Sequence, residues 1–217
     1  MISTVFLDLD GTLTDSRRGI LYGASYALRE LGILVPWSEV TTEFIGPPLY
    51  DSFRKYYGLS DADARRAVAL YREYYGREGL FENEVYPGVP ELLASLKEAG
   101  LSLYLATGKP HPYARRIVAH FGLDRYLDGV FGAEFDGTHG DKADLLTYAM
   151  GELGVLPSEA IMVGDRRFDM EGALSVGVIP IGALWGYGDR KELQAAGGRL
   201  LAESPEEVGE AILALLK

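Results

Sequence analysis

The sequence predicts an α/β fold in which an all-helical segment interrupts a parallel-sheet core. Short apolar runs alternate with longer helical patterns over most of the chain, as in βαβ units. Residues 15–83 break this alternation and show only helical patterns. This segment is also nearly neutral, with 9 basic and 10 acidic residues, whereas the whole chain carries a net charge of −11. The remaining residues therefore hold almost all of the negative charge.

The core strands are expected where short apolar runs occur, at residues 4–9, 101–106, 130–135, 160–163, 178–184 and 199–201. The helices between them have recognisable ends, because proline suits a first helical turn and glycine suits the position just past a last one. These helices are expected at 90–99, 112–121, 142–153 and 205–216. The order of elements indicates a Rossmann-like core built from residues 1–14 and 84–217.

The insert, residues 15–83, is expected to form a separate helical cap domain directly after the first strand. Helical patterns lie near residues 17–31, 38–45, 49–57 and 60–77. The segment Gly46-Pro47-Pro48 divides them, because two consecutive prolines cannot lie inside a helix or a central strand. Eight of the 14 tyrosines fall in the insert, where we expect most of them to pack a small helical bundle.

Composition narrows the classes of function. The 217 residues include no cysteine, which excludes disulfides, thiolate metal sites and cysteine nucleophiles. A net charge of −11 disfavours nucleic acid as a partner, because the chain would repel a phosphate backbone. No apolar run approaches the roughly 20 residues of a membrane span. We therefore expect a cytoplasmic protein with no nucleic-acid or membrane partner.

Acidic residues follow two of the predicted strands. Asp8 and Asp10 lie at the end of the first strand, with Leu9 between them facing the core, and Asp165 follows the strand at 160–163. Asp169 lies four residues further on, on the same face if a helix begins there. Neighbouring carboxylates ionise easily only beside a cation. Oxygen ligands without cysteine indicate a hard cation, and Mg²⁺ is expected.

Two further segments suit a bound anion. Thr107-Gly108-Lys109-Pro110 follows the strand at 101–106, where a hydroxyl, an accessible N–H and a helix start can hold an anion. Lys142 opens the next helix, and a lysine in a first turn is disfavoured by the helix dipole unless a negative group holds it there. The segment from Trp185 to Gly188 is expected as a loop after the fifth strand that borders the site.

Taken together, these segments resemble the motifs of the haloacid dehalogenase-like phosphohydrolases. The four motifs match, in order, Asp8-Leu9-Asp10-Gly11-Thr12-Leu13, then Thr107, then Lys142, then Gly164-Asp165 with Asp169. The resemblance covers essentially the whole chain, and the insert lies where members with a helical cap carry it. Residues 45–49 and the Thr-Gly-Lys-Pro segment most resemble phosphoglycolate phosphatase-like members. The chain departs from the pattern at Arg166, where Thr or Ser is common, and at Ala143, where Pro is common.

The resemblance implies a division of labour. Asp8 is the expected nucleophile, Asp10 the general acid and base, and Thr107 and Lys142 assist catalysis. Phosphate is expected to bind Asp8, Leu9, Asp10, Thr107, Gly108 and Lys142. Mg²⁺ is expected at Asp8, the Asp10 backbone carbonyl, Asp165 and Asp169, the last acting through water or by orienting Asp165. Substrate specificity is expected from Gly46, Pro47, Pro48 and Lys109.

These roles describe a Mg²⁺-dependent phosphomonoester hydrolase acting on a small phosphorylated metabolite resembling phosphoglycolate, as a monomer or homodimer. Alternatives within the superfamily are a phosphomutase resembling β-phosphoglucomutase, a nucleotidase or a pyrophosphatase. A dehalogenase is disfavoured, because it has no leaving alcohol for Asp10 to protonate. The alternative from another class is a non-catalytic binding module, which would be expected to lack the nucleophile or a metal ligand.

Overall fold

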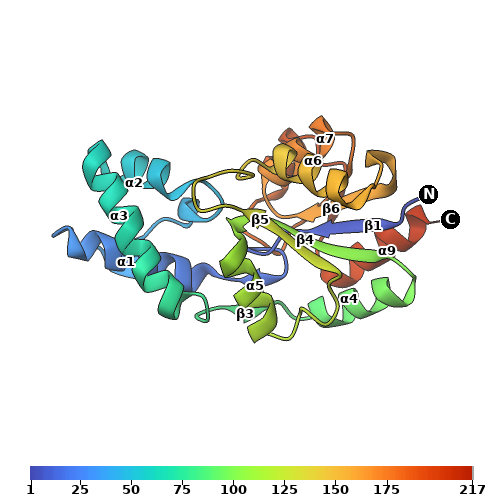
Figure 1. Cartoon of the computed structure of the whole chain (residues 1–217), viewed down its shortest axis with the longest axis horizontal. Helices are drawn as coiled ribbons and strands as arrows, with labels where there is room; N and C mark the ends of the chain where they lie inside the picture. The colour runs from blue at the N-terminus through green and yellow to red at the C-terminus, as the bar shows by residue number, and fades with distance from the viewer. Residues whose placement is uncertain (217) are drawn as a thin grey trace. The chain divides into compact units, whose positions relative to one another are not determined.

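The computed structural model describes residues 1–216 and contains a six-stranded parallel sheet (Figure 1). The strand order is β5-β4-β1-β6-β7-β8. The strands are β1 (Thr4–Leu7), β4 (Ser102–Pro110), β5 (Gly129–Ala133), β6 (Ala160–Gly164), β7 (Ile179–Ala183) and β8 (Leu200–Ala202). The central β1 pairs with β4 on one side and β6 on the other. The direction of the strand order reverses there, which is where open α/β sheets bind their ligands.

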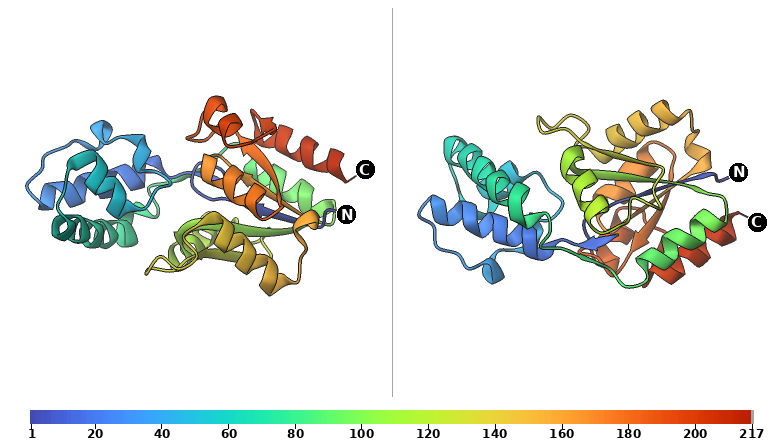
Figure 2. Two further views of the ribbon diagram at one scale, coloured as in Figure 1. Left: turned by 90° about the horizontal axis from the view of Figure 1, so that it is seen from above. Right: turned by 60° about the horizontal axis from the view of Figure 1, so that its bottom comes forward.

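Helices cover both faces of this sheet, which confirms the predicted Rossmann-like α/β core (Figures 1 and 2). On one face α6 (Lys142–Leu153) lies beside α7 (Arg167–Ser175), and on the other α4 (Val89–Glu98) lies beside α9 (Pro205–Leu215). The helix α5 (His111–His120) packs on β4 and β5, and the short α8 (Arg190–Ala195) precedes β8. Phe6, Ala106 and Met162 of neighbouring strands pack with Leu145 and Leu146 of α6, and all four residues of the central β1 are buried.

The chain divides into two compact units, one of Met1–Thr14 with the chain from Val85 onward and one of Asp15–Glu84. The second unit contains α1 (Arg17–Glu30), α2 (Leu49–Tyr57) and α3 (Asp61–Tyr74), with 3₁₀ turns at Trp37–Glu39 and Thr42–Phe44. Its aromatic rings pack together: Tyr71 stacks on Tyr75, and Phe44 meets Phe53 edge to face. The strands β2 (Thr14–Asp15) and β3 (Glu84–Val85) pair where the chain passes between the units.

Several element boundaries differ from the prediction. The helix expected over 38–45 is wrong, because two 3₁₀ turns occupy this segment and Pro47-Pro48 stops any longer helix. The strand β1 ends at Leu7, so Asp8 and Asp10 lie in the following loop. By contrast β4 continues to Pro110 through a break in register after Thr107. The pattern over 60–77 is α3 followed by a π-helical turn at Tyr75–Gly79.

No helix among residues 1–216 combines the length and apolarity needed to cross a membrane.

Candidate active site

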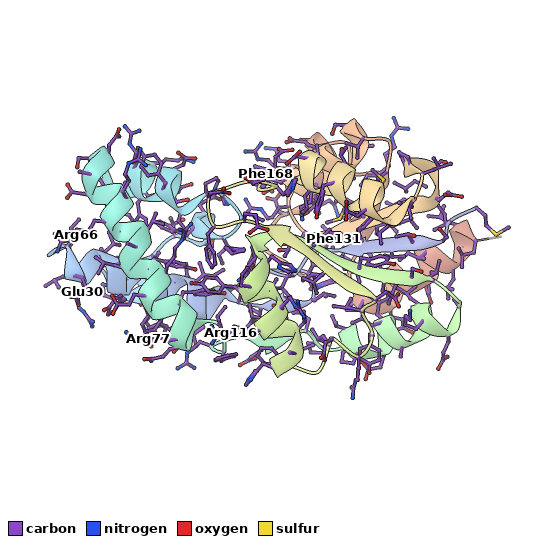
Figure 3. The ribbon with its side chains drawn as sticks, in the orientation of Figure 1. Glu30, Arg66, Arg77, Arg116, Phe131 and Phe168 are labelled. Atoms are coloured by element: carbon purple, nitrogen blue, oxygen red, sulfur yellow. The ribbon has the colours of Figure 1, made fainter. Side chains whose placement is uncertain are left out.

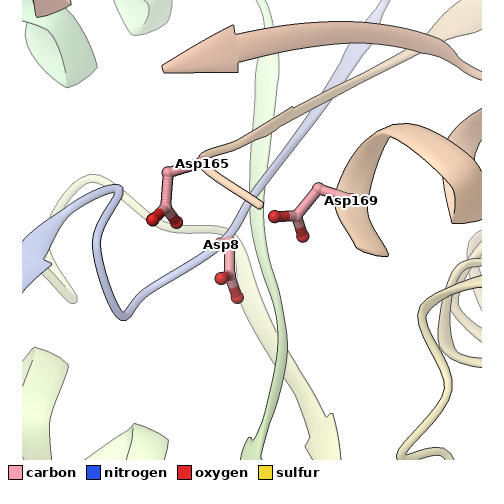
Figure 4. Close-up of side chains that lie close together, drawn as sticks. All are labelled: Asp8, Asp165 and Asp169. Atoms are coloured by element: carbon pink, nitrogen blue, oxygen red, sulfur yellow. The ribbon is translucent and has the colours of Figure 1, made fainter. Parts of the chain in front are cut away.

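The loop after β1 and the end of β6 lie side by side and bring their acidic residues together. The Asp8 N–H donates to the Val163 carbonyl at 2.9 Å, which ties the two strand ends together. Asp8, Asp165 and Asp169 each offer a carboxylate oxygen, and these three atoms lie within 4.8 Å of one another (Figure 4). Asp165 is fully buried and Asp169 nearly so. Acids predicted at the ends of two separate strands therefore form one cluster.

Lys142 is the cation that faces this cluster. Its Nζ lies 3.1 Å from Asp8 Oδ1 and 2.8 Å from Asp169 Oδ1, and it donates to the Ala106 carbonyl at 2.8 Å. The side chain is 7% exposed. Lys142 is the first residue of α6, which begins at the Asp141 N-cap. The two carboxylates are the negative partners that hold a lysine in this otherwise unfavourable first turn.

Burial and mutual repulsion dominate the protonation of the cluster. Burial, followed by the charges of Asp169 and Asp8, raises the pKa of the Asp165 carboxyl well above its usual range. Burial also raises the pKa of Asp169, although Lys142 opposes this rise. Burial alone would lower the pKa of Lys142, but Asp169 and Asp8 outweigh it and raise that pKa. One lysine thus compensates only part of the negative charge of three ionised carboxylates.

The donor set fits a hard divalent cation. The cluster offers three carboxylates, the ligand type that Mg²⁺ prefers, and its burial makes an added positive charge favourable. The Asp169 carboxylate is already engaged on both oxygens, by Lys142 and by the Arg166 N–H at 3.0 Å. These two contacts hold the Asp169 carboxylate in place, and its indirect role at the metal stays a prediction. By accepting that N–H, Asp169 also caps the first turn of α7, whose N-cap residue is Arg166.

Asp10 lies outside the cluster and has its own cation. Lys109 Nζ is 2.8 Å from Asp10 Oδ1, with the lysine side chain 5% exposed and the aspartate 16% exposed. Lys109 lies in the irregular end of β4, where its N–H donates to Thr107 Oγ1 at 3.3 Å. The ion pair with Asp10 places Lys109 beside the expected general acid. The specificity role predicted for Lys109 stays a prediction.

The expected phosphate-binding residues lie after β1, in the last part of β4 and at the start of α6. Thr107 is buried on β4, one residue after Ala106, whose carbonyl holds Lys142. Gly108 follows it and is exposed, while Leu9 is fully buried between Asp8 and Asp10. Gly46, Pro47 and Pro48 belong to the other unit, in the segment between the turn at Thr42–Phe44 and α2. Their role in specificity stays a prediction.

Sequence reasoning missed several groups that hold the acids in place. Thr12 Oγ1 donates to Asp165 Oδ1 at 3.1 Å, and the Tyr187 N–H donates to Asp165 Oδ2 at 2.8 Å. Glu192 of α8 accepts from Arg166 Nε at 2.8 Å and from the Arg167 N–H at 2.9 Å. The run Trp185-Gly186-Tyr187-Gly188 was the available signal, because glycines beside aromatics after a strand allow a loop to approach closely.

Comparison with known proteins finds a hydrolase family and several phosphatases. The model of the haloacid dehalogenase-like hydrolase family matches residues 2–177, and a related hydrolase-like model matches residues 142–213. A 5'-nucleotidase of Pseudomonas aeruginosa is 43% identical over 88% of this chain and 86% of that protein. The crystal structure of a predicted phosphatase from Clostridium acetobutylicum superposes with a TM-score of 0.93 at 40% identity, covering 99% of both chains.

Two further relatives carry the names of other phosphoryl-transfer enzymes. The tyrosine-protein kinase PtkA of Mycobacterium tuberculosis is 41% identical over 85% of this chain, which spans 62% of the length of PtkA. A phosphoglycolate phosphatase of Aquifex aeolicus is 30% identical over 84% of this chain and 85% of that protein. The family model matches most of the chain, and the acidic cluster lies at the ends of β1 and β6, where the four motifs placed its residues. The chain therefore belongs to the haloacid dehalogenase-like hydrolases, among the phosphatases of that superfamily.

Proposed function

We propose that this chain is a Mg²⁺-dependent phosphomonoester hydrolase that works through an aspartyl-phosphate. The observation that carries the proposal is the buried Lys142, held between Asp8 and Asp169 beside Asp165. Phosphoryl transfer needs positioning and neutralisation of negative charge more than covalent assistance. A nucleophilic carboxylate beside a buried lysine and two further acids meets both needs.

In the proposed reaction, an Asp8 oxygen attacks phosphorus while the bond from phosphorus to the leaving oxygen breaks. Asp10 gives its proton to that oxygen, and the alcohol leaves. Asp10 then takes a proton from water, whose oxygen attacks the phosphorus of the aspartyl-phosphate and releases inorganic phosphate. This second step regenerates the Asp8 carboxylate and a protonated Asp10, so the cycle closes.

Asp8, Asp165 and the Asp10 backbone carbonyl would hold the Mg²⁺ ion, with Asp169 in the indirect role. The ion would supply positive charge against the phosphoryl oxygens. Lys142 shares its charge between Asp8 and Asp169 and holds both carboxylates in place. Thr107 and the Gly108 N–H would orient the remaining phosphoryl oxygens from the end of β4.

Two substrate classes compete for this site. A small metabolite resembling phosphoglycolate is supported by the likeness to phosphoglycolate phosphatases at 30% identity. A nucleoside 5'-monophosphate is supported by the higher identity, 43%, to a 5'-nucleotidase. The unit Asp15–Glu84 would act as a cap that selects among such substrates, with the Gly46-Pro47-Pro48 segment reading the part beyond the phosphate. The core would supply the same chemistry to either class.

A phosphate-release screen with Mg²⁺ near pH 7 tests the proposal. The panel should include phosphoglycolate, sugar phosphates, nucleoside 5'-monophosphates, pyrophosphate and phosphotyrosine, each analysed for free phosphate and for isomerised product. Release of phosphate from at least one monoester, without isomerisation, is the expected result. Production of an isomer alone would identify a mutase, and the absence of turnover across the panel would contradict the proposal.

A further inference from the structure

The loop between β7 and α8, residues 184–189, lies against the acidic cluster without contributing a carboxylate to it. The Trp185 Nε1–H donates to the Thr12 carbonyl at 3.0 Å. Two residues later, the Tyr187 N–H donates to Asp165 Oδ2 at 2.8 Å. The loop therefore joins the segment after β1 to the acid after β6. These two segments are more than 150 residues apart in the sequence.

Asp165 is held on both of its carboxylate oxygens. Thr12 Oγ1 donates to Oδ1, and the Tyr187 N–H donates to Oδ2. The carbonyl of the same Thr12 accepts from the Trp185 indole, so one residue touches both the acid and the loop. The carboxylate plane is thus fixed by two donors whose own positions depend on each other.

Three glycines let the loop and the segment after β1 approach this closely. A Cβ on Gly186 would collide with the Asp165 side chain and the Gly11 carbonyl, and a Cβ on Gly188 would collide with the Asp165 carbonyl. Gly11 has φ +88° and leaves no space for a Cβ beside the Asp165 carboxylate. The packing around Asp165 therefore requires glycine on both sides of it.

The far end of the loop is fastened as well. Asp189 caps α8 by accepting the Glu192 N–H at 2.7 Å, and the Glu192 carboxylate accepts from both Arg166 and Arg167. Arg166 directly follows Asp165 and stands where Thr or Ser is common, so its pair with Glu192 links α8 to the end of β6. The loop is anchored on either side of the carboxylate that it contacts.

We propose that the β7–α8 loop is a positioning element for the metal, with the Trp185 indole as its anchor. By holding the segment after β1 against the loop, Trp185 keeps the Thr12 hydroxyl and the Tyr187 N–H on the two oxygens of Asp165. A carboxylate held in one orientation loses less conformational freedom when it binds a cation. Groups that donate hydrogen bonds to metal-ligating side chains commonly alter the affinity for the metal. The inference rests on the proposed Mg²⁺-dependent function and names the residues that tune it.

The test is Mg²⁺ binding by the metal-stripped protein, measured by titration calorimetry. Trp185→Phe keeps an aromatic ring and removes only the indole donor, and we expect it to raise the Kd for Mg²⁺ about fivefold. Gly186→Ala displaces the loop directly and should raise the Kd by at least about tenfold. Melting temperatures of the metal-free proteins, measured in parallel, separate loss of metal affinity from loss of the fold.

The chain offers matched controls for both variants. Trp37→Phe changes the other tryptophan, which stacks on Tyr22 in the inserted unit. Gly151→Ala adds a methyl to α6, where nothing lies within 4 Å of it. Both controls should keep the wild-type Kd. Values within twofold of wild type for Trp185→Phe and Gly186→Ala, in folded proteins, would overturn the positioning role.

The proposed function is tested separately from the loop. A wild-type protein that binds Mg²⁺ but releases no phosphate from any monoester would contradict the hydrolase while leaving the Kd comparison valid. A wild-type protein that binds no Mg²⁺ would overturn both.

Discussion

The two units of the chain place their charges differently. In the sheet-containing unit, Asp165, Asp169 and Lys142 are each less than a tenth exposed, and Lys142 pairs with Asp169. In the inserted unit the charged side chains lie outside, as Glu30, Arg66 and Arg77 illustrate (Figure 3). Its interior is aromatic and aliphatic, with Phe44, Phe53 and Tyr75 among the largest buried side chains.

This difference locates the chemistry. Burying charge usually costs stability, because the energy lost on leaving water often exceeds the attraction regained between the charges. The inserted unit follows the rule by packing rings and solvating its charges. The sheet-containing unit departs from it around the acidic cluster, at the carboxyl ends of β1 and β6, and at the nearby buried Lys109 and Arg166. A departure of this kind marks a site where charge is retained for a reaction.

The largest expected effect is loss of the nucleophile. Asp8→Asn should lower kcat by at least about 10³-fold, because an amide oxygen cannot form the aspartyl-phosphate. Phosphate release gives the rate, and circular dichroism shows that the fold is retained. Asp51→Asn, in the exposed first turn of α2, is the matched change in the inserted unit and should keep wild-type kcat. Wild-type kcat for Asp8→Asn would contradict the covalent mechanism.

Removing the cation beside Asp10 should have an effect that depends on the leaving group. Lys109→Met leaves the Asp10 carboxylate without its 2.8 Å partner and free to take other orientations. We expect kcat for an alkyl phosphate to fall about ten- to 100-fold, with a smaller loss for p-nitrophenyl phosphate, which needs no proton to leave. Lys55→Met, an exposed lysine of α2, is the control. Equal losses of kcat with both substrates would show that Lys109 does not act through the proton transfer by Asp10.

Changes in the inserted unit should alter selectivity rather than chemistry. Replacing Pro47 and Pro48 together by glycine relaxes a segment that the ring geometry holds in place. The ratio of kcat/KM between phosphoglycolate-like and nucleotide substrates should change by about tenfold, with much less effect on a small aryl phosphate. Competition assays with paired substrates measure this ratio. Equal losses on all substrates would show that the segment only supports the fold.

The buried acids should also give the metal-free protein an unusual pH dependence. The pKa of Asp165 is raised in the folded state, so the folded protein binds more protons than the unfolded chain at pH values between the ordinary pKa of 3.8 and the raised one. Its free energy of unfolding therefore falls as pH rises through this window, by up to about 1.4 kcal/mol per pH unit.

Urea unfolding in EDTA at pH 5.5, 6.5 and 7.5 measures this effect. Asp165→Asn should flatten the dependence, since the amide does not ionise, leaving a smaller slope from Asp169. Added Mg²⁺ should stabilise the wild type most at the highest pH. Parallel slopes for wild type and Asp165→Asn would show that this carboxyl is not the source.

The smallest effect is expected from a surface ion pair of the inserted unit. Arg77 and Glu73 are paired at 3.1 Å with both side chains more than half exposed. Arg77→Ala should lower the free energy of unfolding by only about 0.3–0.5 kcal/mol and leave kcat unchanged. Thermal unfolding with an activity assay checks both. A loss above about 2 kcal/mol would contradict the view that charge in this unit is only surface charge.

Sequence alone could predict the sheet and the acids of the cluster because both follow from local patterns. The apolar run before Asp165 marks a buried strand, and parallel strands bring their carboxyl ends to one edge. The helix expected over 38–45 failed because a helical spacing of apolar residues also fits successive 3₁₀ turns.

The partners of the acids could not be predicted in the same way. The contacts of Trp185 with Thr12 and of Lys109 with Asp10 join segments far apart in the chain, and they depend on strand order and loop path. A lysine in a sequence is most often solvated, so nothing local marks Lys109 as the partner of Asp10, whereas the place of Lys142 in a first helical turn indicated a negative partner without identifying it. Only the folded sheet places them beside carboxylates.

The most direct test of the account is turnover with and without metal. Purified protein is treated with EDTA, assayed for phosphate release on its best monoester substrate, and assayed again after dialysis with added Mg²⁺ or Ca²⁺. EDTA should abolish turnover, Mg²⁺ should restore it fully, and Ca²⁺ should restore it poorly, because Ca²⁺ is larger and less strict in its coordination. Full activity in the chelated, metal-free protein would contradict this prediction.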